Sequence, residues 1–519
     1  MSPQQTIPET ISMEASTPIE TASADLTETD NALETDNTSE TDNTSETDNA
    51  TETDNATETD NAAETDNATE TYHATETYHT TETYHATEMD HAAEINMPGN
   101  AAPEPSEIKA ANVSHTGRLR VNVTSSAGLF PIVNATITIY DAKDPENLLE
   151  TLITSISGQT DITELPAPCP DWSLLPSEEQ PYSEYNIHVA AEGYAPVRIF
   201  HSELLPNVLS IQNITMNPLT DRNAEEAKVV PIDPHTLFHE YPARIVEEEI
   251  KPMAETGDSV LSRVVIPEFI IVHDGVPSDP AARNYWIRYK DYIKNVVSCE
   301  IYPTWSEAAI YANILTIMSF TMNRVYTEWY RNQGYEFTIT SSTAHDQKWI
   351  YGHNIYENVD YLVDRVFASY LSRPGVKQPI LTSHCDGKRF RCDGLNQWDS
   401  QALSEEGYSA IEIIRYFFGD DMYMNTAQVI SGVPSAWPGY NLTIGAAGDN
   451  VKQMQTQLNR IARNYQVLPF ISADGIYGQK TAEDVNTFQS IFNLPQTGIT
   501  DYATWYGISE IYAASSRNI

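Results

Sequence analysis

A six-residue repeat occupies much of the first hundred positions of the chain. From Asn31 to His91 the unit ETDNAT is followed, in the same register, by ETYHAT. The first 100 residues hold 24 acidic side chains and no Lys or Arg, and the repeat offers scarcely an aliphatic group. Because such a segment cannot bury enough apolar surface to offset its ordering entropy, we expect residues 1–108 to form a disordered acidic tail.

The charge and hydropathy of the chain exclude some classes of partner. The 519 residues carry a net charge of -45, and beyond residue 100 there are 50 acidic groups against 29 basic ones. No run of Lys and Arg occurs, so we expect no binding to nucleic acid. No apolar run reaches 18 residues, so we expect no membrane span. The start of the chain, MSPQQTIPETISMEAS, also lacks the basic and apolar regions of a secretory signal.

Residues 109–218 favour strands. Six stretches rich in β-branched and aromatic residues alternate with a period of two and are separated by turn residues. They are Gly117–Val123, Ala135–Tyr140, Leu149–Ile156, Tyr185–Ala190, Val197–His201 and Val208–Met216. This spacing predicts a small antiparallel β-sandwich. Because no nucleophile, base and orienting residue occur together here, we expect adhesion, spacing or inhibition of a neighbouring domain.

Residues 219–262 are polar and acidic, with RNAEEAK near the start and RIVEEEIKPMAETGDS near the end. A connection of this length between two compact units is expected to be an exposed linker that proteases can reach.

Residues 263–428 predict an α+β domain with polar loops after its strands. The expected helices are Ser306–Arg331, Asn358–Leu371 and Tyr408–Phe418, and the expected strands include Tyr335–Thr340 and Pro379–Ser383. Loops on a rigid scaffold are common places for functional sites.

The most informative stretch of this domain is YKDYIKNVVSCEIYPTW, Tyr289 to Trp305. Its apolar residues recur at helical spacing and end at Glu300, on or beside the buried face. Burial disfavours the charged carboxylate, so we expect a raised pKa for Glu300, as a general acid requires. The other interpretation is a helix-end glutamate with a solvent or salt-bridge role.

Residues 440–515 predict a small three-helix domain. Asp449–Ile461 and Thr481–Phe492 are amphipathic, and glycine turns precede each later helix. The motifs GDNVKQMQTQL, DGIYGQKTAEDVNTFQ and LPQTGITDYATW closely resemble the peptidoglycan-binding domain 1 family. The resemblance implies a groove for cell-wall glycan or peptide near Asp474 and Tyr477. The other interpretation is that most of these motif residues build the turn and the core.

Two further resemblances concern the preceding regions. The stretches VNATITIYD and EGYAPVRI are similar to transthyretin-like or carboxypeptidase-regulatory sandwich modules. The central domain resembles the stage II sporulation protein D family in three patches, YIKNVVSCEIYPTW, ITSSTAHDQKWIYG and GLNQWDSQALSEEGYSAIEIIRYFFGDD. The domain order resembles the spore cortex-lytic enzymes of the SleC type.

The central resemblance implies a lytic transglycosylase that cleaves the β-1,4 bond between N-acetylmuramic acid and N-acetylglucosamine in the spore cortex during germination, leaving a 1,6-anhydromuramic end. It implies Glu300 as the sole catalytic acid and base, without a cofactor. Expected sugar contacts are Tyr302, Thr343, Asp346, Gln347, Tyr351, Gln397 and Trp398, with core packing as the other interpretation for Trp398 and Tyr351.

The chain also departs from the family pattern. Many members carry Arg-Thr-Tyr where Met318, Ser319 and Phe320 stand, and the usual S-Q-W/Y-G-A becomes Asn396 to Ser400. These departures keep open the alternative of a protein that binds peptidoglycan and enhances a wall amidase without cutting glycan. A structural spore protein is a third alternative.

The sequence also bears on metal binding, on the location of the protein in the cell and on its activation. A zinc cluster of His345, His384, Cys385 and Cys392 is conceivable but not favoured, and Cys385 and Cys392 could instead pair or stay free. The missing secretory signal favours synthesis in the mother cell and deposition on the spore. The exposed linker favours activation by a protease.

Overall fold

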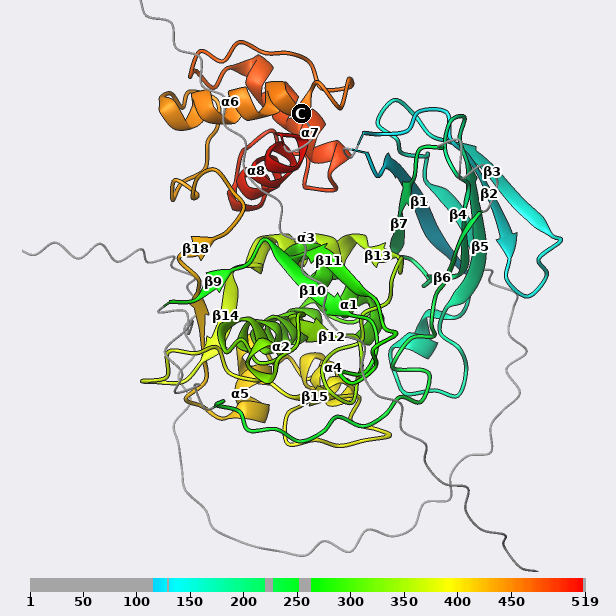
Figure 1. The fold of residues 1–519 in the computed structure, drawn as a ribbon, viewed down its shortest axis with the longest axis vertical. Helices are drawn as coiled ribbons and strands as arrows, with labels where there is room; N and C mark the ends of the chain where they lie inside the picture. Colours follow the sequence, from blue (N-terminus) through cyan, green and yellow to red (C-terminus); the bar gives the residue numbers. More distant parts are fainter. Residues whose placement is uncertain (1–114, 128–129, 220–226, 252–262, 517–519) are drawn as a thin grey trace, which may run out of the picture. The chain divides into compact units, whose positions relative to one another are not determined.

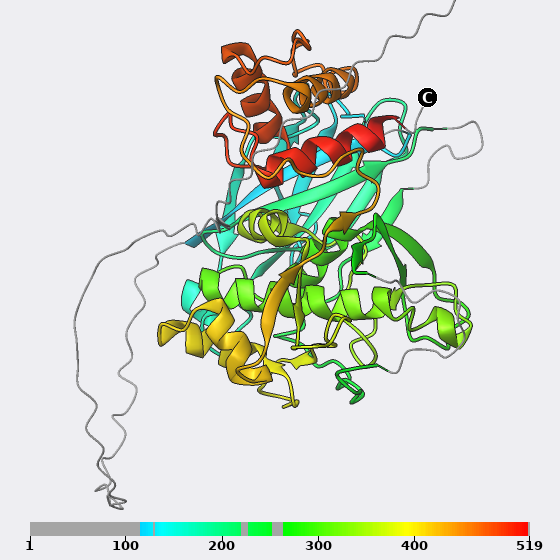
Figure 2. The same cartoon turned by 90° about the vertical axis from the view of Figure 1, so that its left-hand side faces the viewer.

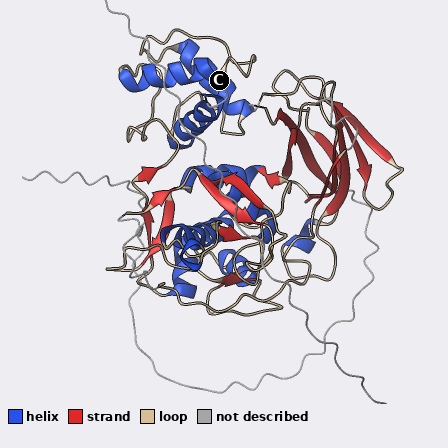
Figure 3. Cartoon of the chain, in the orientation of Figure 1, coloured by secondary structure: helices blue, strands red, loops and turns tan. Residues whose placement is uncertain are grey.

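The computed structural model describes residues 115–127, 130–219, 227–251 and 263–516. The chain divides into two units, residues 1–102 and 103–519. The tail expected over residues 1–108 lies outside the described residues. The described part contains a β-rich region followed by a region of mixed sheets and helices (Figures 1 and 3).

The β-rich region contains two sheets that enclose an aliphatic core. The first has the order β13-β7-β1-β4, in which β13 is Ile355–Tyr356, and the second has the order β3-β2-β5-β6-β8. The strands are β1 His115–Ser125, β2 Thr136–Asp141, β3 Leu148–Ile153, β4 Thr163–Ala167, β5 Ser183–Ala190, β6 Val197–Leu204, β7 Leu209–Met216 and β8 Lys228–Pro231, with a short helix η1 Pro170–Ser173. Strand β1 buries every second side chain, so Leu119, Val121 and Val123 face the core.

The expectation of a purely antiparallel sandwich is wrong in two places. Strand β1 pairs with β7 in parallel, and β6 pairs with β8 in parallel. Alternation along one strand reports which side chains are buried, but it carries no information about the direction of the neighbouring strand.

The linker expected over 219–262 is also corrected, because β8 and the residues after it are folded against other elements. We call residues 232–251 the strap. His235 and Lys251 are buried, and the Leu381 N–H donates to the Glu249 carbonyl at 3.0 Å. Its outer surface is exposed, most strongly at Val246. Residues 220–226 and 252–262 of the expected linker lie outside the described part.

The central region is built around α2, Glu307–Tyr326, which begins where the Ser306 side chain accepts a hydrogen bond from the Ala309 N–H at 3.2 Å. Most of α2 is buried, as expected for a helix that is apolar on nearly all sides. Figure 2 shows this helix running across the centre of the region, beside α4 Gln397–Glu405 and α5 Ala410–Phe418.

The other elements of this region follow the chain around α2. They are β9 Val265–Ile266, β10 Phe269–His273, β11 Asn284–Arg288, α1 Tyr289–Glu300, η2 Arg331–Gln333, β12 Ile339–Thr340, β13 Ile355–Tyr356, α3 Glu357–Val366, β14 Ser369–Ser372, β15 His384–Cys385, β16 Leu395–Asn396, β17 Tyr423–Thr426 and β18 Val429–Ile430. The helix expected over 358–371 ends at Val366, because β14 pairs with the distant β17. The strand expected at 379–383 does not form.

Strand β13 belongs to the sheet of β7 and β1, so the β-rich region and the central region share a hydrogen-bonded ladder. Buried amides reinforce it, since Gln212 Nε2 donates to the Gly352 carbonyl and Asn354 Nδ2 to the Glu203 carbonyl. The two regions are therefore continuous rather than joined by a tether alone.

The last region contains three helices, as expected: α6 Asp449–Ile461, α7 Gln479–Ile491 and α8 Tyr502–Ser516. The turn before α7 requires Gly475, whose φ of 77° favours glycine and whose missing Cβ would lie 3.1 Å from the Gly448 carbonyl oxygen. Phe488 and Trp505 fill the core. None of the helices that the structure describes is long and apolar enough to cross a membrane.

Candidate functional site

Glu300 ends α1 and is almost enclosed, with 4% of its surface exposed. Its Oε2 lies 2.8 Å from His384 Nε2 and accepts from Gln397 Nε2 at 3.3 Å. Its Oε1 accepts from the Lys348 backbone N–H at 2.8 Å. A buried carboxylate with partners on both oxygens is fixed in orientation, so its position is defined by three separate chain segments.

The partners of Glu300 reverse the expected direction of its pKa. Burial by itself raises the pKa of Glu300, but the charge and hydrogen bond of His384, the charge of Arg244 and the Lys348 N–H outweigh it. The pKa of Glu300 therefore lies below its ordinary value, and the expectation of a raised pKa is wrong for this state of the site.

His384 is oriented by acceptors on both sides of its ring. Nδ1 lies 3.2 Å from the Thr382 carbonyl oxygen, and Nε2 lies 2.8 Å from Glu300 Oε2. Each ring nitrogen therefore has an acceptor within hydrogen-bond distance, and the Arg244 Nη2 donor also lies 3.3 Å from Nε2. His384 and Gln397 are brought together because β15 pairs with β16, the strand that leads directly into α4.

The cavity beside Glu300 is small because the strap covers it. It holds about 70 Å³, whereas ligand pockets commonly span roughly 300–1,000 Å³. Its wall is formed by Thr236, His239, Tyr241, Pro242, Ala243, Arg244, Glu300, Thr343, His384, Cys385, Asp386, Arg389, Phe390 and Gln397. A site of this size holds a few waters, not a sugar ring.

Arg244 of the strap contacts His384, the hydrogen-bond partner of Glu300. Its guanidinium lies 4.6 Å from the centre of the Phe320 ring, its Nε donates to the His384 carbonyl at 3.4 Å, and Nη2 lies 3.3 Å from His384 Nε2. Its Nη1 is buried without a hydrogen-bond partner. The strap therefore brings a positive charge close to the Glu300–His384 pair.

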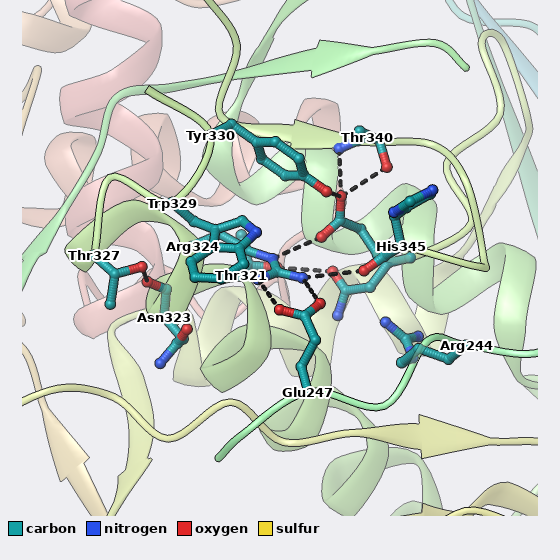
Figure 4. A network of polar contacts seen from close by, with 12 residues as sticks. Arg244, Glu247, Thr321, Asn323, Arg324, Thr327, Trp329, Tyr330, Thr340 and His345 are labelled. Atoms are coloured by element: carbon teal, nitrogen blue, oxygen red, sulfur yellow. Dashed lines mark hydrogen bonds and ion pairs between the residues drawn. The ribbon is translucent and has the colours of Figure 1, made fainter. Parts of the chain in front are cut away.

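A second strap contact explains the position of Asp346, which was expected to bind sugar. Arg324, fully enclosed in α2, donates to Asp346 Oδ1 at 2.7 Å and to both carboxylate oxygens of Glu247 (Figure 4). Asp346 Oδ2 accepts from the Tyr330 hydroxyl at 2.6 Å and from the Thr340 N–H at 2.9 Å. With both oxygens occupied and no exposed surface, Asp346 stabilises the fold and is not available to a ligand in this structure.

Most of the other expected sugar contacts also pack in the interior. Gln347 accepts from the Tyr292 and Thr321 hydroxyls and is buried. Tyr302 stacks on His235 with ring centres 4.5 Å apart, and Trp398 lies 5.9 Å from the Tyr302 ring. These three residues are buried and do not line the cavity beside Glu300.

The remaining expected contacts are distributed between the cavity and other surfaces. Thr343 lines the cavity and donates to the strap carbonyl of Pro242 at 3.1 Å. Tyr351 stacks on Tyr285, with ring centres 4.9 Å apart, and does not line the Glu300 cavity. Of the predicted residues, the structure brings together Glu300, Gln397 and Thr343.

In the C-terminal region Asp474 and Tyr477 both serve the glycine turn. Asp474 Oδ1 accepts from the Ile476 N–H at 2.9 Å, and the Tyr477 hydroxyl donates to the Gly498 carbonyl at 2.9 Å. Asp474 is exposed and can meet a ligand, whereas Tyr477 is buried.

Sequence reasoning missed the roles of His384, Arg244 and the Lys348 N–H. The sequence suggests His384 only as a zinc ligand. No local pattern indicates that a backbone amide or a residue of an expected linker faces Glu300, since both depend on contacts between distant segments.

Cys385 and Cys392 form a disulfide, so in this structure they are not thiolate ligands. Among the described residues no group of three or more His, Cys, Asp and Glu side chains is arranged to hold a metal ion.

Comparison with known families identifies one region. Residues 447–506 match the family described as putative peptidoglycan binding domain. The C-terminus of the chain thus carries a peptidoglycan-binding domain, which indicates association with the cell wall. The comparison with curated proteins finds no match.

Three solved structures are each similar to about a fifth of the chain. The Bacillus anthracis TIE protein is 12% identical over 20% of this chain and 17% of its own, with a TM-score of 0.14. The minor pilin GBS52 of Streptococcus agalactiae is 11% identical over 22% of this chain and 49% of its own, with a TM-score of 0.16. Catechol 1,2-dioxygenase of Acinetobacter sp. ADP1 is 14% identical over 23% of this chain and 60% of its own, with a TM-score of 0.15. The chain thus spans less than two thirds of each of these proteins, and these likenesses carry no functional argument.

Proposed function

We propose that the protein is a peptidoglycan lytic transglycosylase that uses Glu300 as its acid and base. The observation that carries the proposal is a single buried carboxylate, held by His384, Gln397 and the Lys348 N–H at the wall of a cavity. The C-terminal peptidoglycan-binding domain supports it, because it supplies the polymer on which such a carboxylate acts. The resemblance to spore cortex-lytic enzymes gives the substrate, the cortex glycan, and the setting, the germinating spore.

The proposed reaction begins with Glu300 as the neutral acid. A proton that reaches Glu300 along its 2.8 Å hydrogen bond with His384 gives this form. Glu300 then protonates the glycosidic oxygen as the bond to the muramic acid C1 breaks. The resulting carboxylate removes the proton of the muramic acid C6 hydroxyl, whose oxygen attacks C1 and closes the 1,6-anhydro ring.

The surroundings of Glu300 favour a mechanism with one carboxylate over one with two. Asp386 is the other carboxylate among the described residues that line the cavity. Its oxygens accept from the backbone N–H groups of Lys388, Arg389 and Phe390, so they are committed to their own loop. Ordinary glycosidases require a second, available carboxylate. Attack by the substrate's own hydroxyl removes that requirement.

We further propose that the chain is a precursor in which the strap keeps the site closed. The cavity of about 70 Å³ excludes a sugar ring, and Arg244 lowers the pKa of Glu300 in addition to His384. Departure of the strap would enlarge the cavity and remove this charge, and both changes favour the neutral acid. An activating protease that cuts after the strap would allow it to leave.

The test is incubation of full-length protein, before and after cleavage at a protease site engineered into residues 252–262, with cortex peptidoglycan. Mass spectrometry should find anhydromuramic ends after cleavage and none with Glu300→Gln, whose circular dichroism should match wild type. Thr304→Val, at a partly buried site that does not line the cavity, serves as the control variant and should retain cleavage. Undiminished product from Glu300→Gln would contradict the assignment.

A second candidate is a wall-binding protein that enhances an amidase without cutting glycan. The closed cavity and the lowered pKa of Glu300 favour this candidate. It predicts that the chain cut after the strap binds peptidoglycan, stimulates an added amidase and yields no anhydromuramic ends. A structural spore protein predicts neither activity.

A further inference from the structure

We infer that the disulfide between Cys385 and Cys392 is a redox-sensitive clasp that positions the partners of Glu300 and holds the strap over the site. The bridge closes the loop between β15 and β16. The effect of the clasp on glycan cleavage rests on the proposed function. Its effect on the geometry of Glu300 does not.

Both ends of the clasped loop touch Glu300. His384 directly precedes Cys385 and places Nε2 2.8 Å from Glu300 Oε2. On the other side, β16 leads into Gln397, whose Nε2 donates to the same oxygen at 3.3 Å. The paired strands are only two residues long each, so the covalent bridge is a major constraint on their separation.

The tip of the same loop touches the strap. Asp386 accepts backbone hydrogen bonds from within the loop, which fixes the turn that carries Arg389. The Arg389 guanidinium donates to the backbone carbonyls of three strap residues, Thr236, Phe238 and His239. Since these acceptors are main-chain atoms, the contact depends on the position of the loop rather than on strap side chains. One covalent bond thus constrains both the Glu300 partners and the cover of the site.

Thiol reagents can reach the disulfide more readily than they can reach the buried thiol of Cys299. Cys385 and Cys392 are both partly exposed, whereas Cys299 is buried. A dithiol reductant attacks one sulfur as thiolate and forms a mixed disulfide, which its second thiol then resolves. Two electrons and two protons pass to Cys385 and Cys392, which become thiols, and the reductant becomes a disulfide.

Two measurements on the full-length protein follow the clasp independently of glycan cleavage. The first is hydrogen exchange of strap peptides over residues 232–243 before and after dithiothreitol. The second is the pH midpoint of the Glu300 carboxyl, followed by its infrared C=O stretch and assigned by subtraction of the matching Glu300→Gln variant. Alkylation and mass spectrometry establish that both cysteines have been reduced.

Reduction should speed exchange of the strap about tenfold. It should also raise the Glu300 midpoint by about one unit, as expected when a charged hydrogen-bond partner withdraws. The double variant Cys385→Ser/Cys392→Ser should show both changes without reductant and respond no further to it. Cys169→Ser, which keeps the bridge, should behave as wild type. As a control for folding, the thermal melting curve of the double serine variant should retain one main transition at a temperature similar to that of wild type.

Unchanged exchange and an unchanged midpoint after alkylation of both cysteines, or in the double serine variant, would overturn the inference. A response of the double serine variant to reductant would also overturn it, because the effect would then arise elsewhere. Absence of anhydromuramic products would count against the proposed function alone, since neither measurement depends on catalysis.

Discussion

His384 Nε2 lies 2.8 Å from Glu300 Oε2, although the two residues are 84 positions apart in the chain. The contact joins the end of α1 to β15, and both side chains are buried. Because a charged neighbour stabilises the carboxylate, this pair determines whether Glu300 is ionised. The first prediction follows from this pair.

Replacement of His384 by Gln should raise the pKa of Glu300, because the amide keeps hydrogen-bonding capacity but loses the positive charge. We expect an upward shift of about one unit or more, measured from the infrared C=O stretch. His239→Gln is the matched control, since His239 lines the same cavity and is not among the hydrogen-bond partners of Glu300. Equal midpoints in His384→Gln and wild type would contradict this role of His384.

Replacement of Arg244 by Met should also raise the pKa of Glu300. The rise should be smaller than in His384→Gln, because the charge of Arg244 lowers this pKa less than the charge of His384 does. The variant keeps apolar contact with Phe320 but loses the hydrogen bond to the His384 carbonyl. Strap peptides should exchange faster. Glu248→Ala, at an exposed strap position, should leave both quantities unchanged. A strap that exchanges at the wild-type rate in Arg244→Met would argue that Arg244 does not hold it.

Replacement of Arg324 by Met should strongly destabilise the protein. It leaves the buried carboxylate of Asp346 without its charged partner, and such losses cost about 3–5 kcal/mol. The urea midpoint of unfolding should fall accordingly. Arg331→Met removes an exposed pair with Glu328 and should cost less than about 1 kcal/mol. Similar midpoints for the two variants would show that burial of the Arg324 network contributes little.

The C-terminal region should lose stability as the pH rises. Asp484 has no exposed surface, neither carboxylate oxygen has a hydrogen-bond partner, and burial raises its pKa to about 7. The folded state therefore holds this proton more tightly than the unfolded state. Stability is highest below about pH 4, declines towards pH 7 and then stays low, with a total loss of up to about 4 kcal/mol.

Hydrogen exchange of α7 peptides in the full-length protein, measured between pH 5 and pH 8 and corrected for intrinsic rates, checks this dependence. Asp484→Ala removes both buried oxygens and should slow exchange at pH 8 more than at pH 5. Glu483→Ala, at the exposed neighbouring position, should change little at either pH. A pH dependence that survives in Asp484→Ala would assign the effect to another group.

Patterns within short segments were sufficient to predict several elements. The apolar stripe of residues 292–297 predicts α1 and places Glu300 at its buried end, as found. The two amphipathic helices predicted in the last region correspond to α6 and α7, and the predicted glycine turn lies before α7. Helix periodicity depends on neighbours three and four residues apart, so such elements are readable from the chain itself.

Contacts between distant segments could not be read in this way. The segment 219–262 has the composition of a linker, yet it contributes β8 to a sheet and a strap over Glu300, because its scattered Arg244 and Glu247 meet partners from α2 and β15. Asp346 was expected to face sugar because it lies in a polar loop. Its contacts with Arg324 and Tyr330 instead enclose it.

The sequence by itself determined which residues form α1, that Glu300 stands at its buried end, and that residues 447–506 form a peptidoglycan-binding domain. Only the tertiary structure decided the ionisation of that carboxylate. Burial, which the helical stripe predicts, raises the pKa of Glu300, whereas the charges of His384 and Arg244 lower it and prevail. Electrostatic energy depends on distance in space rather than along the chain, so the folded arrangement determines the sign of the shift.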